Sequence, residues 1–163
     1  MTNYTGKEMP IKPHKGKLIE TVIIRYPDFI NWFDGLEHHS GFQSLYDYID
    51  ECIEIFDNKP YTISCKGKVN GDPCLRPPTY ASVYRRTADP VFWCDECNPC
   101  QLGATEEKLS RVSSYREALN HVTAQAQTRE NYRLIIRRMA EAKGLTGKRT
   151  DEKILHFFYG TSE

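Results

Sequence analysis

Apolar residues recur at helical spacing in the sequence FQSLYDYIDECIEIF, residues 42–56. They fall at i, i+3, i+4 and i+7, which is the spacing of the buried side of an amphipathic helix. The apolar positions are Phe42, Leu45, Tyr46, Ile49, Cys52, Ile53 and Phe56, and the acidic positions between them are Asp47, Asp50, Glu51 and Glu54. The pattern predicts one long helix with a solvated acidic face, in which Cys52 is a small core residue.

Two shorter helices are predicted before this one, over residues 19–39, and they meet at Pro27. Proline suits the first position of a helix, because the backbone N–H that it lacks has no intrahelical partner there. Phe29, Trp32 and Phe33 follow at helical spacing. We expect these three aromatic side chains to form the buried face of the second helix.

Helical patterns return after residue 104 and predict three further helices, over about residues 105–122, 128–143 and 151–160. The second is expected to end at Gly144, since glycine commonly follows the last helical turn. The third should be capped by Thr150 and carries two acidic residues in its first turn, where the helix dipole favours them.

Residues 59–103 differ in composition from the helical segments: they contain six prolines, which exclude long helices there. Residues 79–86, TYASVYRR, and residues 91–94, VFWC, are rich in β-forming side chains and predict two strands joined by a short turn. Residues 9–18 predict a short strand or hairpin, because two prolines and a glycine disfavour a helix.

The predicted fold class is α+β and mainly helical, in three parts. Residues 1–58 form a small αβ N-terminal module with the amphipathic helix, residues 59–103 a β-hairpin insert, and residues 104–163 a helical C-terminal region. We expect the three parts to pack as one compact unit.

Charge is balanced overall, with 22 basic and 22 acidic residues, but it is unevenly distributed. Residues 1–60 hold 6 basic and 10 acidic groups, whereas residues 105–163 hold 11 and 8. A polyanionic partner should therefore bind the second half or a local patch. The N-terminus lacks the apolar segment of a secretion signal, and no apolar run approaches the roughly 20 residues that span a bilayer. We expect a soluble cytoplasmic protein with no membrane partner.

Five of the six cysteines lie within residues 65–100, and in a reducing cytosol such a cluster indicates metal binding more than disulfides. The spacing C-x8-C-x19-C-x2-C predicts a zinc-ribbon-like site with four thiolate ligands, Cys65, Cys74, Cys94 and Cys97. Asn98 follows the last of them and tolerates the left-handed conformation that such turns often need.

Alternatives to this ligand set stay open. Cys100 is the reserve ligand that could replace Cys65 or Cys74, and the cysteines could also be unliganded buried thiols or disulfides. His38 and His39 could bind a metal, but a solvated helix end is the simpler interpretation of that pair.

A metal held by four thiolates has no open coordination position, so the expected cofactor is one structural zinc. The insert is short and rich in proline, and the metal would supply stability that apolar burial cannot. It would also position the surface residues of the hairpin, which are Lys66, Lys68, Arg76, Tyr80, Tyr84, Arg85 and Arg86.

The sequence HKGKLIETVIIRYPDFINWF, residues 14–33, resembles the small module at the C-terminus of exodeoxyribonuclease X and its stand-alone relatives. The turn matches in residues 14–17, a short helix follows, and the second, aromatic-rich helix matches through Pro27, Phe29, Ile30 and Trp32. Lys12-Pro13 departs from the glycine usual before the turn. The resemblance extends over about residues 9–45. It implies an αβ accessory module found with nucleic-acid enzymes, and it brings no catalytic residues.

Basic residues suggest where nucleic acid could bind. The turn around Gly16 carries Lys15 and Lys17, which together with exposed backbone amides suit a phosphate. The stretch 129–149 holds seven basic and two acidic groups, and Arg129, Arg133 and Arg137 recur every fourth residue beside an apolar face, while Arg85 and Arg86 lie in the hairpin insert. Solvated lysines and arginines paired with neighbouring acids are the alternative interpretation.

No catalytic motif is recognisable, and GLTGKR lacks the first glycine and the hydroxyl residue of a phosphate-binding loop, so neither an enzyme nor a nucleotide cofactor is expected. The predicted function is a zinc-stabilised, non-catalytic nucleic-acid-binding protein or an accessory subunit of a nucleoprotein complex. The alternative is a small regulator, such as a phage- or plasmid-borne inhibitor, that docks on a nucleic-acid enzyme or defence complex. It would use Tyr80, Tyr84, Trp93 and the acidic helix.

Overall fold

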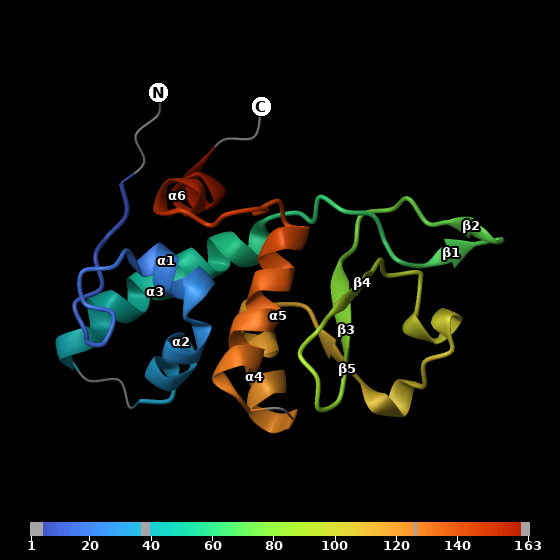
Figure 1. Ribbon diagram of the computed structural model, residues 1–163, viewed down its shortest axis with the longest axis horizontal. Coiled ribbons are helices and arrows are strands. Elements are labelled where there is room, and N and C mark those ends of the chain that lie inside the picture. The colour runs from blue at the N-terminus through green and yellow to red at the C-terminus, as the bar shows by residue number, and fades with distance from the viewer. Residues whose placement is uncertain (1–4, 37–39, 126, 161–163) are drawn as a thin grey trace.

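The computed structural model describes residues 5–36, 40–125 and 127–160 of the chain. Within these ranges six α-helices form a body, and two small antiparallel sheets belong to an arm that extends from it (Figure 1). The predicted α+β, mainly helical class is confirmed. The helices are α1 (Ile19–Arg25), α2 (Pro27–Asp34), α3 (Gln43–Asn58), α4 (Tyr115–Gln125), α5 (Arg129–Ala142) and α6 (Asp151–Tyr159). The strands are β1 (Lys68–Val69), β2 (Asp72–Pro73), β3 (Tyr80–Tyr84), β4 (Val91–Trp93) and β5 (Leu109–Val112).

The N-terminal segment forms the predicted hairpin-like turn in front of α1. The Met9 amide donates to the Lys17 carbonyl at 2.7 Å, the Gly16 amide donates to the Met9 carbonyl at 2.9 Å, and Glu8 forms a bridge with Leu18. Gly16 has φ +89°, a left-handed conformation that glycine adopts without steric cost. The turn brings Met9 into the core and leaves Lys17 exposed.

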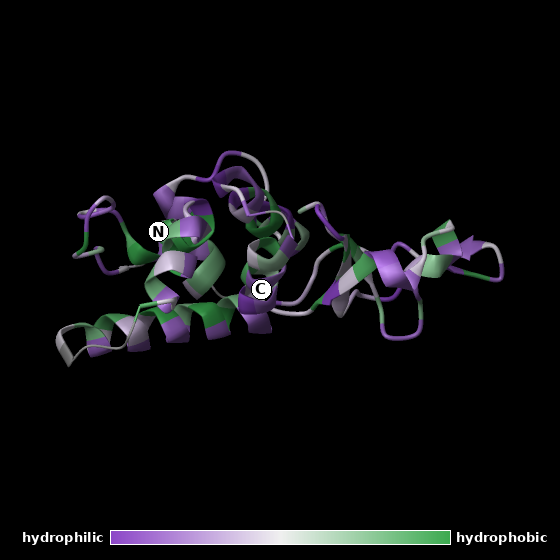
Figure 2. Ribbon diagram, turned by 90° about the horizontal axis from the view of Figure 1, so that it is seen from below, coloured by the Kyte–Doolittle hydropathy of each residue, from purple (hydrophilic) through white to green (hydrophobic). Residues whose placement is uncertain are grey.

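The helical body is built around α1, which packs against α2, α3, α5 and α6. Its side chains from Ile19 to Ile24 are buried, including the polar Glu20 and Thr21. The long helix α3 matches its predicted pattern, with its apolar side buried and its acidic side exposed, and hydrophobic and hydrophilic residues alternate along its ribbon (Figure 2). Phe42 differs: it precedes the helix and is partly exposed.

The three-stranded sheet, in the order β4-β3-β5, separates two cores. Alternate side chains of a strand point to opposite faces. Ala81, Val83, Phe92 and Val112 therefore join the core of the helical body, whereas Tyr80 and Trp93 join a smaller cluster with the cysteines. Trp93 donates from Nε1 to the Ser82 hydroxyl at 2.8 Å on that second face.

The root of the arm is fixed to the ends of α3 and α5. The Thr62 amide donates to the Ala142 carbonyl at 2.8 Å. The buried Lys143 ammonium donates to the Phe56 carbonyl at 2.7 Å and to the Asp57 carbonyl at 3.2 Å. Burial lowers the pKa of Lys143 to about 8, although the charge of Asp57 acts in the opposite direction. The arm therefore leaves the body from a hydrogen-bonded junction.

One predicted helix, over residues 105–122, is wrong in its first half. Residues 106–108 form a short 3-10 turn and Leu109–Val112 form strand β5, which pairs with β3; the helix begins only at Tyr115. The Glu117 amide donates to the Ser114 hydroxyl, so a serine caps the true start. Pairing with the edge of β3 stabilises the strand conformation of residues 109–112 more than their weak local helix propensity stabilises a helix.

Two side chains predicted to be buried or exposed differ in the structure. Trp32 was expected on the buried face of α2, but 53% of its surface is exposed, while Phe29 and Phe33 are buried as expected. The helix ends at Asp34, which leaves Trp32 in the last turn, at the margin of the core. Tyr80, expected at the surface of the arm, is buried against the cysteines.

Thr150 caps α6 as predicted, since its hydroxyl oxygen accepts a hydrogen bond from the Lys153 amide at 3.2 Å. Replacing Thr150 with alanine should lower the free energy of unfolding by about 1 kcal/mol, because that amide loses its acceptor. Urea unfolding measures the change. Thr150→Ser keeps the oxygen and should stay close to wild type; equal losses in both variants would contradict the capping role.

The described residues contain no helix that combines the length and the apolar character needed to cross a membrane.

Candidate metal centre and basic face

Four cysteines from three separate segments meet in the arm, on the face of the sheet that points away from the body. Cys65 precedes β1, Cys74 follows β2, and Cys94 and Cys97 follow β4. All four are buried, and their sulfur atoms lie within 4.8 Å of one another. The Sγ atoms of Cys74 and Cys94 are 3.9 Å apart. A tetrahedral site with metal–sulfur distances near 2.3 Å requires sulfur–sulfur separations of about 3.8 Å, so this arrangement fits one ion.

Backbone amides converge on the sulfur of Cys65. The Gly67 amide donates to it at 3.3 Å and the Cys94 amide donates at 3.2 Å. Such hydrogen bonds stabilise negative charge on a thiolate. The Tyr80 hydroxyl donates to the Cys97 carbonyl at 2.8 Å and fixes the second pair from the sheet side.

Gly67 lies so close to Cys97 that only glycine fits. A Cβ atom at position 67 would lie 2.6 Å from the Cys97 sulfur and 2.7 Å from its Cβ. The Gly67 carbonyl also accepts from the Cys74 amide at 2.8 Å. This residue was not singled out from the sequence, although a glycine two positions after a ligand cysteine is a recognisable sign of a tight turn around a metal.

Cys94 and Cys97 differ in the pKa of their thiols. Burial alone would raise the pKa of Cys94, but hydrogen bonds from the Glu96 and Cys97 amides outweigh it and lower the pKa to about 7. Burial raises the pKa of Cys97 to about 12, and its thiol neighbours act in the same direction. Without a metal, the Cys97 thiol therefore keeps a proton at neutral pH, which a bound cation would displace.

The four thiols are suited to bind a soft metal ion, and they would fill all four positions of its tetrahedral coordination. Four sulfur ligands complete a tetrahedron, so a substrate or water molecule has no coordination position. The site is expected to hold the arm together. All six cysteines belong to the described residues, and none of them is in a disulfide.

The other candidate ligands lie elsewhere. Cys100 is exposed and outside the cluster, and Cys52 is buried in the body. His38 and His39 lie outside the described residues. Asn98 was predicted to adopt a left-handed conformation, but its φ of −136° is extended. Its side chain instead accepts from the Cys100 amide at 3.0 Å and starts a 3-10 turn.

Several predicted nucleic-acid contacts meet on one face of the body, around Tyr26. The Lys17 ammonium lies 4.4 Å from the centre of the Tyr26 ring, and the Arg133 guanidinium lies 5.0 Å from it. His14 stacks on the same ring with centroids 4.3 Å apart. Burial lowers the pKa of His14, and the charges of Lys17, Arg133 and Arg129 lower it further, against a smaller opposing effect of Asp28. At neutral pH this face therefore holds a neutral histidine among cations.

The arginines of α5 form ion pairs within this face. Arg129 and Arg133 both contact Asp28, with nearest distances of 3.7 and 3.0 Å. Arg137 lies 3.9 Å from Glu141. These ion pairs agree with the alternative interpretation of the α5 arginines, in which neighbouring acids neutralise part of their charge.

The basic face continues beyond the predicted residues. Burial lowers the pKa of Arg149, and the charges of Arg137 and Arg25 lower it further, while Glu141 raises it. Arg25 and Arg149 therefore lie near the end of the α5 stripe. Arg149 belongs to the basic stretch 129–149 that the sequence predicts, whereas Arg25 was missed, because it ends α1 and lies more than a hundred residues before its neighbours. We define the basic face as Lys17, Arg25, Arg129, Arg133, Arg137 and Arg149.

The remaining predicted contacts are Lys15, beside the basic face, and Arg85 and Arg86, on the arm. Lys15 is exposed in the N-terminal turn, two residues before Lys17. Arg85 and Arg86 are exposed in the turn after β3, on the arm, and Arg86 has a left-handed φ of +69°. Trp93, named for the protein-docking alternative, is almost fully buried, whereas Tyr84 is exposed as predicted.

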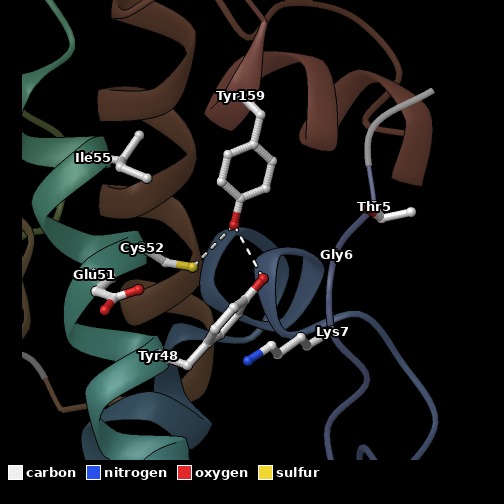
Figure 3. Close-up of a pocket in the computed structure, with 8 residues that line it drawn as sticks. All are labelled: Thr5, Gly6, Lys7, Tyr48, Glu51, Cys52, Ile55 and Tyr159. Carbon is white, nitrogen blue, oxygen red and sulfur yellow. Dashed lines mark hydrogen bonds between the residues drawn. The ribbon is translucent and has the colours of Figure 1, made fainter. Parts of the chain in front are cut away.

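A pocket of about 450 Å³ lies between α3, α6 and residues 5–7 (Figure 3). The Tyr48 and Tyr159 hydroxyls lie 3.1 Å apart, and the Cys52 sulfur lies 3.5 Å from the second. Both phenols donate to the fully buried Glu20. Burial raises the pKa of Cys52 to about 12 and raises the pKa of both phenols. These groups keep their protons at neutral pH, so none of the three is an activated nucleophile.

Comparison with protein-family models, curated proteins and solved structures finds no match to this chain. The function must therefore be argued from its own residues.

Proposed function

We propose that the chain is a zinc-stabilised, non-catalytic nucleic-acid-binding protein that acts alone or as an accessory subunit of a nucleoprotein complex. The observation that carries the proposal is the basic face, in which residues from the N-terminal turn, the end of α1, α5 and the segment before α6 come together. Phosphates are the common anionic group of DNA and RNA, and lysine and arginine supply most contacts to them.

Zinc is the metal that suits the arm best. Four thiolates in tetrahedral geometry are typical of structural zinc sites, and the ligands leave no open position for catalysis. The resemblance of residues 14–33 to the accessory module of exodeoxyribonuclease X supports the same role, because that turn supplies Lys17 to the basic face.

The internal ion pairs reduce the charge of the basic face without cancelling it. The carboxylates that its arginines contact are Asp28 and Glu141, against six basic side chains. The Arg137–Glu141 pair is exposed and such pairs contribute little free energy, so a phosphate can compete with it. The two acids also hold the long arginine side chains in place, which lowers the entropy that binding costs.

Replacing Arg133 and Arg137 together with alanine should weaken binding to oligonucleotides and flatten its salt dependence. Each lost phosphate contact lowers the slope of log K against log salt by about 0.9 on duplex DNA and about 0.7 on single strands. Filter binding between about 50 and 200 mM salt measures the slope. The control is Arg138→Ala with Lys153→Ala, which removes the same charge outside the basic face. The absence of wild-type binding at low salt would overturn the proposal, as would equal slopes in both double variants.

A second candidate, protein docking, is favoured by apolar side chains exposed on the arm. Leu75 is 82% exposed, and Val69 and Leu102 are about half exposed. The Lys68 amide donates to the Gln101 side chain at 2.8 Å, which places residue 102 near β1. Partner binding through this patch would depend weakly on salt, and Leu75→Ser would weaken it without changing oligonucleotide binding.

A further inference from the structure

Among the phenylalanine, tyrosine and tryptophan side chains that the structure describes in the body, Trp32 is the most exposed. It lies in the last turn of α2 with 53% of its surface exposed, while its neighbours Phe29 and Phe33 are 6% and 0% exposed. Tryptophan is large and apolar, and leaving it in water forgoes the burial that would stabilise the fold. Tryptophan exposed in this way is common where a ligand covers it.

Trp32 ends a row of aromatic rings that leads to the basic face. His14 stacks on Tyr26 at 4.3 Å and meets Phe29 edge-on at 5.1 Å, and Phe29 lies 5.5 Å from Trp32. His14 and Phe29 are buried and Tyr26 is partly buried, so the exposed indole projects from a rigid base. A rigid aromatic surface loses little entropy when another ring stacks on it.

Two arginines contact Asp28, which lies one helical turn before Trp32. Asp28 precedes it by four residues, and residues at that spacing share one face of a helix, with Cβ atoms about 5–6 Å apart. Arg129 and Arg133 both contact the Asp28 carboxylate. Arg133 also lies over Tyr26, next to Lys17. An aromatic platform and several phosphate-binding groups therefore share one surface.

We propose that Trp32 is a base-stacking platform and that the ligand of the basic face is single-stranded nucleic acid. A base can stack on the indole only when it is free of its own neighbours, whereas the arginines and Lys17 can bind phosphates of any strand. Duplex DNA hides its bases inside the helix, so Trp32 would contribute nothing there. This inference rests on the proposed function, and its test separates the two.

The first experiment measures the affinity of a twelve-nucleotide oligothymidylate and of a duplex of the same length. Trp32→Ala should weaken binding of the single strand about 5- to 150-fold. It should leave duplex affinity and the salt slope unchanged. Trp32→Phe keeps a ring and should lose less. Phe42→Ala is the matched control, because Phe42 is also a partly exposed aromatic but packs against Phe33.

The second experiment uses intrinsic fluorescence. The chain contains only two tryptophans, and Trp93 is almost fully buried in the arm. Oligothymidylate should quench the emission of the wild-type protein and leave the emission of Trp32→Phe nearly unchanged.

Each outcome decides a different point. If wild type binds single strands but Trp32→Ala binds equally well, the stacking platform is wrong and the basic face stands. A loss of equal size on duplex and single strand also overturns the platform. If wild type binds neither nucleic acid at low salt, the proposed function fails with it. Unchanged thermal unfolding of Trp32→Ala is the expected control for folding.

Discussion

Cys94→Ser is expected to lose the metal and to unfold the metal-binding side of the arm, while the helical body and the sheet residues in its core stay folded. The serine hydroxyl is a poor zinc ligand, and the remaining three thiols would be left buried around an incomplete site. The second core contains only Cys65, Cys74, Tyr80, Trp93, Cys94 and Cys97, with Val91 packed against it. Structural zinc contributes on the order of 10–16 kcal/mol to the folding of small zinc modules, far more than so few apolar side chains can supply.

Two measurements check this result. Elemental analysis should return about one zinc per wild-type chain and almost none for Cys94→Ser. Trp93 belongs to the second core, so its emission should shift to the red when the arm unfolds. Cys100→Ser is the matched control, since Cys100 is exposed and outside the cluster. Full zinc content in Cys94→Ser would contradict the ligand set, and a wild-type protein that keeps its spectrum in strong chelator would contradict the structural role of the metal.

Gly67→Ala should weaken zinc binding about 10- to 100-fold, the usual effect of disturbing groups around the ligands. The new methyl group would overlap the Cys97 side chain, and the backbone cannot move away freely. The Gly67 amide donates a hydrogen bond to the Cys65 sulfur, and the Gly67 carbonyl accepts one from the Cys74 amide. The variant must therefore give up either a ligand position or these hydrogen bonds.

Competition with a coloured chelator measures the affinity. Gly41→Ala is the control, because a Cβ atom there meets nothing within 4 Å. If Gly67→Ala held zinc as tightly as Gly41→Ala does, the close packing around Cys97 would not matter for the site.

The clustering of the four cysteines could be predicted from the sequence because metal chemistry restricts which residues can converge on one ion. Few residue types bind zinc, and the spacing of Cys65, Cys74, Cys94 and Cys97 allows a hairpin to bring them together. Cysteine spacing does not show the backbone conformation around the site. Asn98 was expected to adopt a left-handed conformation after Cys97, but it is extended. The position where only glycine fits is instead Gly67, which packs against the Cys97 side chain.

The helices with strong periodicity, such as α3, could also be predicted, but β5 could not. Its four residues pair with β3 over a gap of about 25 positions, and a local pattern carries no information about such a partner. Trp32 was missed for a related reason. Spacing assigned it to the buried face, but only the length of α2 and the packing of its neighbours determine which positions the core can cover.

The sheet that separates the two cores makes the arm inseparable from the body. Ala81 and Val83 are covered by helices, while Tyr80 and Ser82, on the same strand, cover the sulfur cluster. An arm fragment that ends at residue 103 would lack β5, so the hydrogen-bonding edge of β3 would be unpaired. Without the helices of the body, Ala81 and Val83 would also be exposed to water. The metal site is therefore not an independent folding unit: a fragment that contains only the arm needs the helices of the body to cover its sheet.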